Sequence, residues 1–295
     1  MTHDQYSTTF THWAESAETR LVQLCDAYLP AESRIGQAAR YSLLGGGKRI
    51  RAVLTLAACE LAGASAESAL DYACALEMLH CYSLIHDDLP CMDNDDFRRG
   101  KPSCHKQFGE DIALLAADAL VTAAFEVIAN AALPAESRIQ AVSVLSRAGG
   151  ARGMLFGQEL DKIYEQEPAT EEQLRSLHAH KTGALIIAAT DLGCAAAGAA
   201  PSVRQALNCY AAEVGLVFQI VDDILDVTST TEELGKPVGS DVAHDKTTFV
   251  SLYGLEGAHR LADEHNTTAL NALQNLGEPA DFLRLLAVEL LQRKK

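Results

Sequence analysis

The chain has 295 residues, of which 48% are hydrophobic and 22% charged, a balance typical of globular proteins and not of disordered ones. Its 24 basic and 40 acidic side chains give a formal net charge of −16, which disfavours non-specific binding to nucleic acid or to an anionic membrane. An anionic ligand would therefore need bound cations, and metal ions are the simplest source of them.

Residues 1–20 hold no apolar segment of the kind that forms a secretory signal. The eight cysteines are scattered along the chain without a CxxC pair. This pattern predicts reduced and mostly buried thiols, not a disulfide framework or a zinc site. We therefore expect a cytoplasmic protein.

Apolar residues recur at helical spacing, as in segments 21–28, 54–61 and 216–227. Alternating β-branched runs with turn dipeptides are missing, and no linker rich in Gly, Ser or Pro divides the chain. Some of the prolines mark helix starts or stops: Pro134, Pro168, Pro201 and Pro279. The sequence predicts an all-α fold of roughly ten or more helices in a single domain, residues 1–295.

The first densely charged segment is GGGKRIR, residues 45–51. Its glycines permit a close approach of the backbone to a ligand, and Lys48, Arg49 and Arg51 could bind phosphate. The segment differs from the GxxxxGK[ST] loop of nucleotide hydrolases. A glycine-rich cap between two helices would explain the glycines as well.

The first acidic cluster, residues 87–96, follows a predicted apolar helix over 70–86. Pro90 should end that helix near Leu89, so that the chain can fold back and bring Asp87 and Asp93 to one ion. The cluster is followed by three basic residues, Arg98, Arg99 and Lys101. Aspartates on metal ions and arginines on phosphate would use both signs of charge, whereas simple surface ion pairs are the alternative.

Three further lysines stand apart from any basic cluster: Lys181, which precedes Thr182, Lys236 in LGKP and Lys246 in DKTT. Each alone would be an ordinary surface lysine. Segment 184–200 is the most apolar of the chain, but Asp191 and two glycines interrupt it. It predicts a buried helix and not a membrane span.

The second acidic cluster lies on a predicted apolar helix over 214–227. Asp222 and Asp226 are one turn apart, which brings their Cβ atoms to about 5–6 Å and calls for a compensating cation. Oxygen ligands of this kind suit Mg²⁺, which is usually completed by water and substrate phosphates. A solvated acidic face is the alternative, but the Val, Ile and Leu neighbours disfavour it. Gln219 adds a neutral hydrogen-bonding group one turn earlier.

Together these motifs resemble those of the trans-isoprenyl diphosphate synthases, and most closely the bacterial farnesyl diphosphate synthases. The match runs from about residue 41 to about residue 254. It rests on five motifs: GGGKRIR, HDDLPCMDNDDFRRGKP (86–102), GQELD (157–161), FQIVDDILD (218–226) and GKPVGSDVAHDKTT (235–248). Ala52 departs from the family, which usually has Pro there, and this position is expected to be structural.

The resemblance implies long helices around a central cavity, usually in a homodimer, with three Mg²⁺ ions for which Mn²⁺ could substitute. Asp87 and Asp93 would hold two ions and Asp222 the third. The supporting carboxylates would be Asp88, Asp223 and Asp226. The allylic diphosphate would contact Arg98, Lys181, Thr182, Gln219, Lys236 and Lys246. Isopentenyl diphosphate would contact Lys48, Arg51, His80 and Arg99.

The activity that the resemblance implies is condensation of isopentenyl diphosphate with dimethylallyl or geranyl diphosphate to farnesyl diphosphate (C15). Tyr82 and Ser83, about one helical turn before Asp87, would form the floor that limits chain length. Tyr82 could also be an ordinary core residue. A geranylgeranyl or geranyl diphosphate synthase is the alternative within the family.

Three other classes of protein explain less of the sequence. A terpene cyclase would have no use for the second diphosphate site of Lys48, Arg51 and Arg99. A non-catalytic subunit of a heteromeric prenyltransferase would generally have lost its aspartate motifs, and both are intact here. An acidic metal-binding protein would leave the basic residues unexplained.

Overall fold

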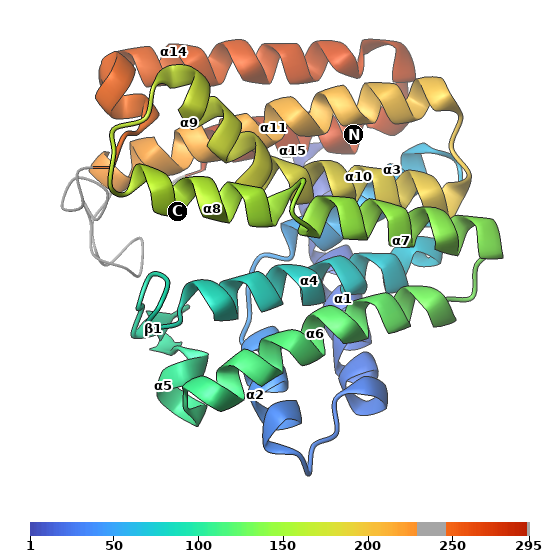
Figure 1. The fold of residues 1–295 in the computed structure, drawn as a ribbon. Coiled ribbons are helices and arrows are strands. Elements are labelled where there is room, and N and C mark those ends of the chain that lie inside the picture. Colours follow the sequence, from blue (N-terminus) through green and yellow to red (C-terminus); the bar gives the residue numbers. More distant parts are fainter. Residues whose placement is uncertain (229–245, 294–295) are drawn as a thin grey trace. The chain divides into compact units, whose positions relative to one another are not determined.

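The computed structural model describes residues 1–228 and 246–293. The described part of the chain is 79% helical, and the predicted all-α class is confirmed (Figure 1). The α-helices are α1 (His3–Tyr28), α2 (Arg34–Leu43), α3 (Ile50–Leu61), α4 (Leu70–Asp87), α5 (Cys104–Phe108), α6 (Glu110–Asn130), α7 (Ala135–Gly149), α8 (Met154–Tyr164), α9 (Glu171–His178), α10 (Ala184–Ala197), α11 (Pro201–Thr228), α14 (Phe249–Ala272) and α15 (Asp281–Gln292). The shorter elements are the helical turns η1 (Ala66–Ala69), η2 (Ala179–Gly183), η3 (Gln274–Leu276) and η4 (Glu278–Ala280) and the strands β1 (Phe97–Arg98) and β2 (Lys101–Pro102).

The chain groups into two compact units, each of which holds one acidic cluster. The first-motif unit consists of Asp4–Leu145 and Asp191–Ala199. The second-motif unit consists of Met1–His3, Ser146–Thr190 and Ala200–Lys295. The expectation that residues 1–295 form one domain stays a prediction.

Helix α4 is the central helix of the first-motif unit. It contacts α2, α3 and α6, and Figure 1 shows α4 and α6 side by side. Tyr72, Leu76, Met78 and Leu79 of α4 are at most 1% exposed. A helix that is apolar on all sides is stable only where neighbours cover it, and this packing fixes the direction in which α4 leads into the first acidic cluster.

Residues 97–102 form a β-hairpin, which the sequence did not predict. Phe97 pairs with Pro102 and Arg98 with Lys101 in antiparallel register. The two turn residues, Arg99 (φ 53°) and Gly100 (φ 73°), are both left-handed, as a type I′ turn requires. Strands of two residues carry no alternating pattern, so periodicity could not reveal them.

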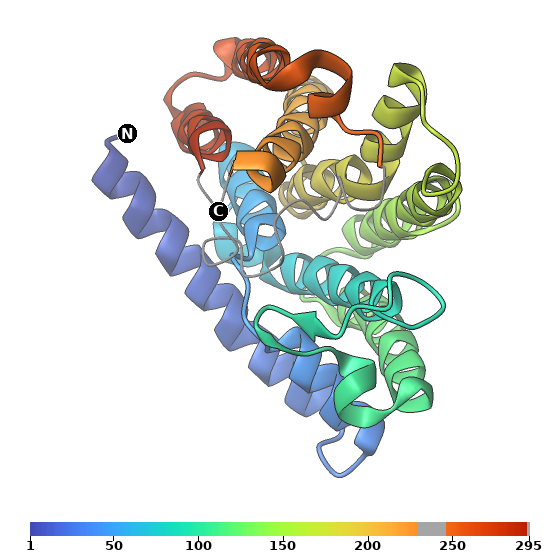
Figure 2. The same ribbon diagram turned by 90° about the vertical axis from the view of Figure 1, so that its left-hand side faces the viewer.

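Helix α11 organises the second-motif unit and contacts α9, η2, α14 and α15. Its residues Val217, Ile220 and Ile224 form a buried cluster with Phe249, the first residue of α14. Figure 2 shows α14 and α15, in orange and red, beside α11. This confirms the helical spacing predicted over 216–227 and places the second acidic cluster on a well-packed helix.

Helix α6 is the one described helix that could cross a membrane by length and composition. This is weak evidence for a span, because core helices pass the same test, and α6 contacts α2, α4 and α5 within its unit. The apolar segment 184–200 was expected to be a buried helix. Helix α10 confirms this, with Leu185, Ile186 and Leu192 at most 3% exposed.

Six of the eight cysteines are buried, and Cys91 and Cys209 are exposed. Burial raises the pKa of the Cys25 and Cys59 thiols to about 11, which keeps them protonated and unreactive at neutral pH. The prediction that most of the thiols are buried is confirmed, and their reduced state stays a prediction.

Candidate active site

The first acidic cluster begins where α4 ends. Asp87 and Asp88 are 7% and 2% exposed, whereas Asp93 is exposed. The backbone N–H of Asp93 donates to the carbonyl oxygen of Asp87 at 2.8 Å, and that of Asn94 donates to Leu89 at 3.1 Å. The chain therefore folds back around Pro90, and the predicted return of Asp93 towards Asp87 is confirmed.

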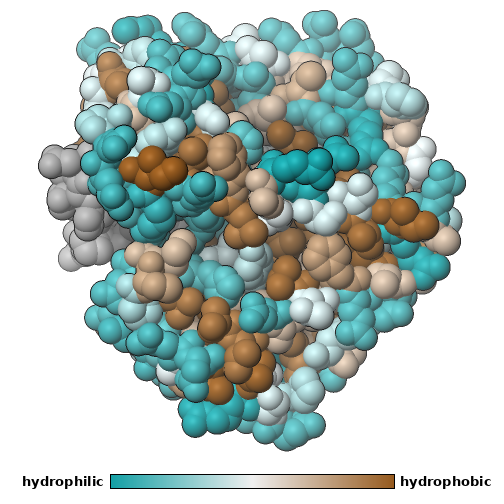
Figure 3. All heavy atoms as spheres, viewed as in Figure 1, coloured by the Kyte–Doolittle hydropathy of each residue, from teal (hydrophilic) through white to brown (hydrophobic). Residues whose placement is uncertain are grey.

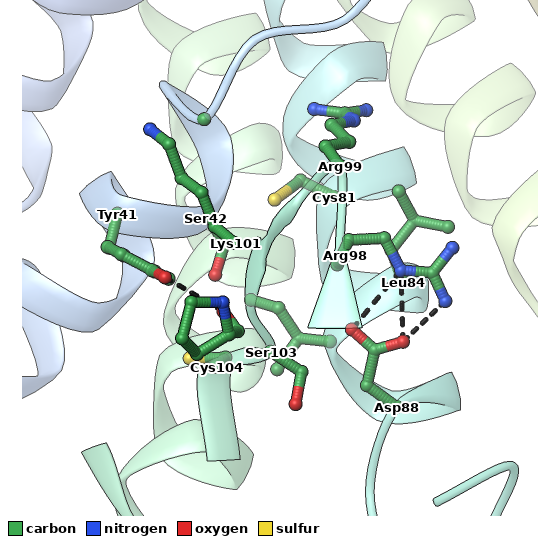
Figure 4. Close-up of a pocket in the computed structure, with 13 residues that line it drawn as sticks. Tyr41, Ser42, Cys81, Leu84, Asp88, Arg98, Arg99, Lys101, Ser103 and Cys104 are labelled. Atoms are coloured by element: carbon green, nitrogen blue, oxygen red, sulfur yellow. Dashed lines mark hydrogen bonds and ion pairs between the residues drawn. The ribbon is translucent and has the colours of Figure 1, made fainter. Parts of the chain in front are cut away.

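Asp88 pairs with Arg98, the second residue of β1. The Arg98 Nε lies 3.0 and 3.2 Å from the two carboxylate oxygens, and Nη2 also donates to Oδ1 (Figure 4). Burial raises the pKa of Asp88, and the hydrogen bond from Arg98 opposes that rise. The hairpin thus directs Arg98 into the cluster through a buried carboxylate, so this pair is not the simple surface ion pair considered above.

Arg99, the first turn residue of the hairpin, contacts the glycine loop. Its Nη1 donates to the carbonyl oxygen of Gly46. Gly47 has a φ of 132°, and a Cβ added there would lie 3.0 Å from Cζ of Arg99. The positive φ favours glycine at this position, and an added Cβ would also displace the end of the Arg99 side chain slightly. The structure brings the GGGKRIR loop and Arg99 together, as the sequence predicts.

His80 lies in the electrostatic field of the same basic group. Its pKa is held well below the usual value by burial and then by the guanidinium groups of Arg51 and Arg99. The ring is therefore neutral at neutral pH and can hydrogen-bond without adding charge. Lys48 is exposed on the neighbouring loop. The predicted isopentenyl diphosphate residues thus share one region of the first-motif unit.

Arg49 is the basic residue of the loop that does not belong to this region. It is 4% exposed, and its guanidinium contacts Glu18 at 2.6 Å, Glu77 at 3.3 Å and the carbonyl oxygen of Leu43 at 2.6 Å. Glu77 also accepts the backbone N–H of Ala52 at 3.1 Å. Arg49 and Glu77 thus anchor the loop, and Ala52 is structural, as expected.

A pocket lies between the acidic cluster and the glycine loop. Asp88, Arg98, Arg99 and Gly45 line it together with neighbouring side chains that include Tyr41, Cys81 and Lys101 (Figure 4). The Tyr41 hydroxyl donates to the carbonyl oxygen of Pro102 at 2.8 Å and so ties α2 to the hairpin. The pocket joins the acidic cluster to the glycine loop within one unit.

Tyr82 and Ser83 lie one turn before Asp87. Tyr82 is 6% exposed, and its ring packs edge-on against His86 at 5.2 Å. Ser83 is 7% exposed and donates to the carbonyl oxygen of His80 at 2.8 Å. Burial and the nearby carboxylate of Asp87 raise the pKa of Tyr82. Tyr82 is thus a packed residue next to the acidic cluster, and its role as a floor stays a prediction.

Asp222, the first residue of the second cluster, has a side chain that is 44% exposed. Its Oδ1 accepts Nη2 of Arg293 at 2.6 Å, and its Oδ2 accepts Nε2 of Gln219 at 3.2 Å. The guanidinium of Arg293 also lies 3.9 Å from the centroid of the Phe218 ring. A cation therefore already neutralises Asp222 in this structure.

Asp223 and Asp226 are buried, at 7% and 3% exposure. Asp223 accepts the backbone N–H of Phe249 at 2.7 Å and so caps the start of α14. The capping box of Thr248 and Ser251 completes this helix start. Residues 246–248 are thereby tied to the second cluster, and Lys246 lies next to α8.

Lys181 and Lys246 meet at a carboxylate that the sequence analysis had not singled out. Nζ of Lys181 lies 2.5 Å from Asp161, and Nζ of Lys246 lies 3.7 Å from Asp161 and 3.0 Å from Glu165. The two lysines overcome burial and lower the pKa of Asp161. GQELD (157–161) was the only signal for this carboxylate, and it did not reveal the partners.

Lys181 and Thr182 lie in the π-helical turn η2, a local feature frequent at functional sites. Gly157 of α8 packs against this turn. A Cβ added at Gly157 would lie 2.1 Å from the backbone nitrogen of Lys181. The close approach of α8 to η2 therefore requires glycine at position 157. This contact fixes the position of the Lys181 backbone relative to α8.

His178, the residue before η2, was also missed. Its Nδ1 lies 3.1 Å from Oε1 of Gln219. Burial lowers the pKa of His178 to about 4. No sequence motif distinguishes this histidine from His180 two residues later. Lys236 lies outside the described residues.

The residues of both clusters fit a hard divalent cation. The donors are carboxylate oxygens, which Mg²⁺ prefers. The structure also shows that both clusters attract positive charge, because Asp88 binds Arg98 and Asp222 binds Arg293. Asp87, Asp93 and Asp222 are therefore suitable metal ligands.

Known proteins are similar to this chain over most of its length. The polyprenyl synthetase family model matches residues 32–282. A farnesyl diphosphate synthase from Micrococcus luteus is 46% identical over 276 residues, 92% of this chain and 94% of its own. A chloroplastic geranylgeranyl pyrophosphate synthase from Arabidopsis thaliana is 50% identical over 236 residues, 78% of this chain and 66% of its own.

Solved structures of related proteins have the same fold as this chain. A geranyltransferase from Legionella pneumophila has a TM-score of 0.87 and 37% identity, covering 98% of each chain. An FPP/GFPP synthase from Zymomonas mobilis has a TM-score of 0.86 and 34% identity, covering 97% of this chain and 99% of its own. The fold is of the all-α isoprenoid synthase type. The chain belongs to the polyprenyl synthetase family.

Proposed function

We propose that this protein is a magnesium-dependent trans-prenyltransferase that makes farnesyl diphosphate from isopentenyl diphosphate and dimethylallyl or geranyl diphosphate, releasing pyrophosphate. The observation that carries the proposal is that each compact unit holds one aspartate cluster together with basic side chains. Arg98 and Arg99 accompany the first cluster. Gln219 contacts Asp222, and Lys181 and Lys246 lie in the same unit. Metal-bound diphosphates require both signs of charge.

In this proposal the metal ligands are Asp87 and Asp93 for two ions and Asp222 for a third. When bound, the magnesium ions supply positive charge to the diphosphate oxygens. Asp88 orients Arg98, and Asp223 holds the start of α14, so these two carboxylates act through their neighbours. Asp226, one turn after Asp222, adds negative charge to the second cluster.

Lys181, Thr182, Gln219 and Lys246 of the second-motif unit are proposed to contact the allylic diphosphate, and Arg98 and Lys236 are assigned to it from the resemblance alone. Asp161 holds Lys181 and Lys246 close together before substrate arrives. Such preorganisation lowers the cost of stabilising the leaving diphosphate. Isopentenyl diphosphate binds to Lys48, Arg51, His80 and Arg99, with His80 as a neutral hydrogen-bonding group.

The reaction needs no protein nucleophile. The C1–O bond of the allylic diphosphate ionises, the double bond of isopentenyl diphosphate attacks C1, and the resulting cation loses a proton to the departing pyrophosphate. Lysine and arginine side chains stabilise the leaving anion, and apolar walls exclude water that would quench the cation. Catalysis therefore consists of positioning and electrostatic stabilisation.

A geranylgeranyl diphosphate synthase is the second candidate, because several relatives that are 47–50% identical carry that name. Incubation of the purified protein with Mg²⁺, labelled isopentenyl diphosphate and each allylic starter, followed by sizing of the products, separates the two. We expect C15 to dominate. A C20 product would favour the second candidate. No turnover with any starter would contradict prenyltransferase activity and favour a non-catalytic subunit of a heteromeric prenyltransferase.

We also propose that the protein is a cytoplasmic homodimer. Apolar side chains gather on the face seen in Figure 3. Helix α6 carries two exposed leucines, Leu114 and Leu115, which are 45% and 46% exposed. Exposed apolar surface of this kind is typical of interfaces. Light scattering after size exclusion should give twice the 31.6 kDa mass of one chain. Leu115→Glu should shift the measured mass towards that of the monomer.

A further inference from the structure

A directed chain of hydrogen bonds runs from His178 to Asp222. Nδ1 of His178 lies 3.1 Å from Oε1 of Gln219, and Nε2 of Gln219 lies 3.2 Å from Oδ2 of Asp222. The carboxylate can only accept, so Gln219 must present its NH₂ group to Asp222 and its oxygen to His178. That oxygen also only accepts. Nδ1 of His178 must therefore carry the proton and donate it.

The surroundings of His178 favour this tautomer. The ring is neutral at neutral pH because burial lowers its pKa to about 4. Among the described residues its Nε2 atom is buried without a hydrogen-bond partner. A buried, unpaired nitrogen costs free energy that a phenylalanine ring of similar size would not. Within this part of the chain, the hydrogen bond to Gln219 is therefore what an imidazole provides here and a phenylalanine would not.

The ring is also held in place. It stacks on Phe249 with centroids 5.4 Å apart and planes at 28°. Phe249 is fully buried, and its backbone N–H donates to Asp223. The second aspartate cluster thus fixes the platform on which His178 rests, and His178 in turn directs Gln219.

We propose that His178 is a positioning residue for the second aspartate cluster, whose Nδ1–H holds the Gln219 amide in the orientation that donates to Asp222. This rests on the proposed function, in which Asp222 is a metal ligand. Without the donor the amide can flip and turn its oxygen towards the carboxylate, so that two acceptors face each other. Loss of a group that orients a metal ligand typically costs about 10–100-fold in metal affinity or activity.

Three histidine variants separate the donor from the ring. His178→Phe keeps an aromatic ring that can stack on Phe249 but has no donor. His178→Asn has an amide whose Nδ2 can take the place of Nδ1. The matched control is His180→Phe, because His180 contacts the carbonyl oxygen of Ser176 and the ring of Phe156.

The measurement is the affinity for Mn²⁺ in the presence of inorganic pyrophosphate, followed by electron paramagnetic resonance, with the melting temperature recorded in parallel. We expect His178→Phe to weaken Mn²⁺ binding by about tenfold or more. His178→Asn should recover most of the affinity, and His180→Phe should match the wild type. Gln219→Met, which removes both hydrogen bonds and also the proposed diphosphate contact of Gln219, should lose at least as much affinity, and His178→Leu, which also lacks the donor, serves where His178→Phe does not fold.

Wild-type Mn²⁺ affinity in His178→Phe or in Gln219→Met would overturn the proposal. So would equal losses in His178→Asn and His178→Phe, because a purely structural role would not respond to the donor. Asp222→Ala tests the underlying site separately. If Asp222→Ala binds Mn²⁺ like the wild type, the assignment of Asp222 itself fails. If it loses binding while His178→Phe does not, only the role of His178 fails.

Discussion

Single carboxylates of this protein have different roles although the sequence shows them as similar aspartates. Asp88 directs an arginine, Asp223 caps a helix and Asp161 gathers two lysines. Asp222 is half exposed, and its neutralising cation comes from the far end of the chain. Exposure and the identity of the partner decide which carboxylate is available to a metal ion.

At this scale we expect Asp87→Ala and Asp222→Ala to fold and to lose turnover by about 10²–10³, the usual cost of one stabilising group in a transition state. Steady-state rates at saturating Mg²⁺ and circular dichroism test this. The control is Asp96→Ala, because Asp96 is exposed and pairs with Lys106 at 2.7 Å. Near-wild-type turnover in either variant would contradict its role.

A second prediction at this scale concerns acid stability. The pKa of His178 is about 4 in the folded state and about 6.5 in an unfolded chain. Below pH 6.5 the unfolded state therefore binds a proton that the folded state does not, and stability falls as the pH drops towards 4. His178→Phe removes this contribution, so its free energy of unfolding should fall less over that range. Urea unfolding at pH 7 and pH 5 measures this change for the wild type and for His178→Phe. An equal change in the free energy of unfolding in the two proteins would contradict the lowered pKa of His178.

The ends of the helices, and the points where helices approach one another most closely, position the charged side chains of the candidate site. Helix α4 ends at the first aspartate cluster, and the start of α14 is tied to the second. The π-helical turn η2 presents Lys181 where α8 approaches it most closely. A displacement of one helix would therefore move several functional groups together.

Gly157→Ala tests the contact between α8 and η2. The added Cβ would lie 2.1 Å from backbone atoms, so the elements must separate. We expect a loss of about 1–3 kcal/mol in the free energy of unfolding and weaker binding of the allylic substrate. Glu159→Ala, on the exposed side of α8, should change neither. An unchanged Michaelis constant in Gly157→Ala would show that η2 does not depend on this contact.

Tyr82→Ala tests how α4 limits the product. Removing the buried ring one turn before Asp87 should lengthen the main product towards C20. Tyr82→Phe keeps the ring and should still give C15. Chromatographic sizing of the products decides between the floor and an ordinary core residue, and an identical profile in all three proteins would refute the floor.

For the whole molecule, ligand binding and folding are linked. Any ligand that binds only the folded state adds about 2.7 kcal/mol of stability at one hundred times its dissociation constant. Mg²⁺ together with pyrophosphate should therefore raise the melting temperature, and EDTA should reverse the rise. Asp222→Ala should show a smaller rise than the wild type. A rise of equal size in both would mean that Asp222 does not contribute to metal binding.

The sequence by itself determined the helical class, the two acidic clusters and the basic residues near them, because helical periodicity and motif spacing are local properties of a chain. The turn around Pro90 was also predictable, since proline restricts its neighbours directly. Only the tertiary structure decided that Arg49 is a buried anchor while Arg51 and Arg99 lie with His80. It also decided that Asp161 pairs with Lys181 and that His178 contacts Gln219. Those assignments depend on burial and on partners distant in sequence, which only the packing of the helices fixes.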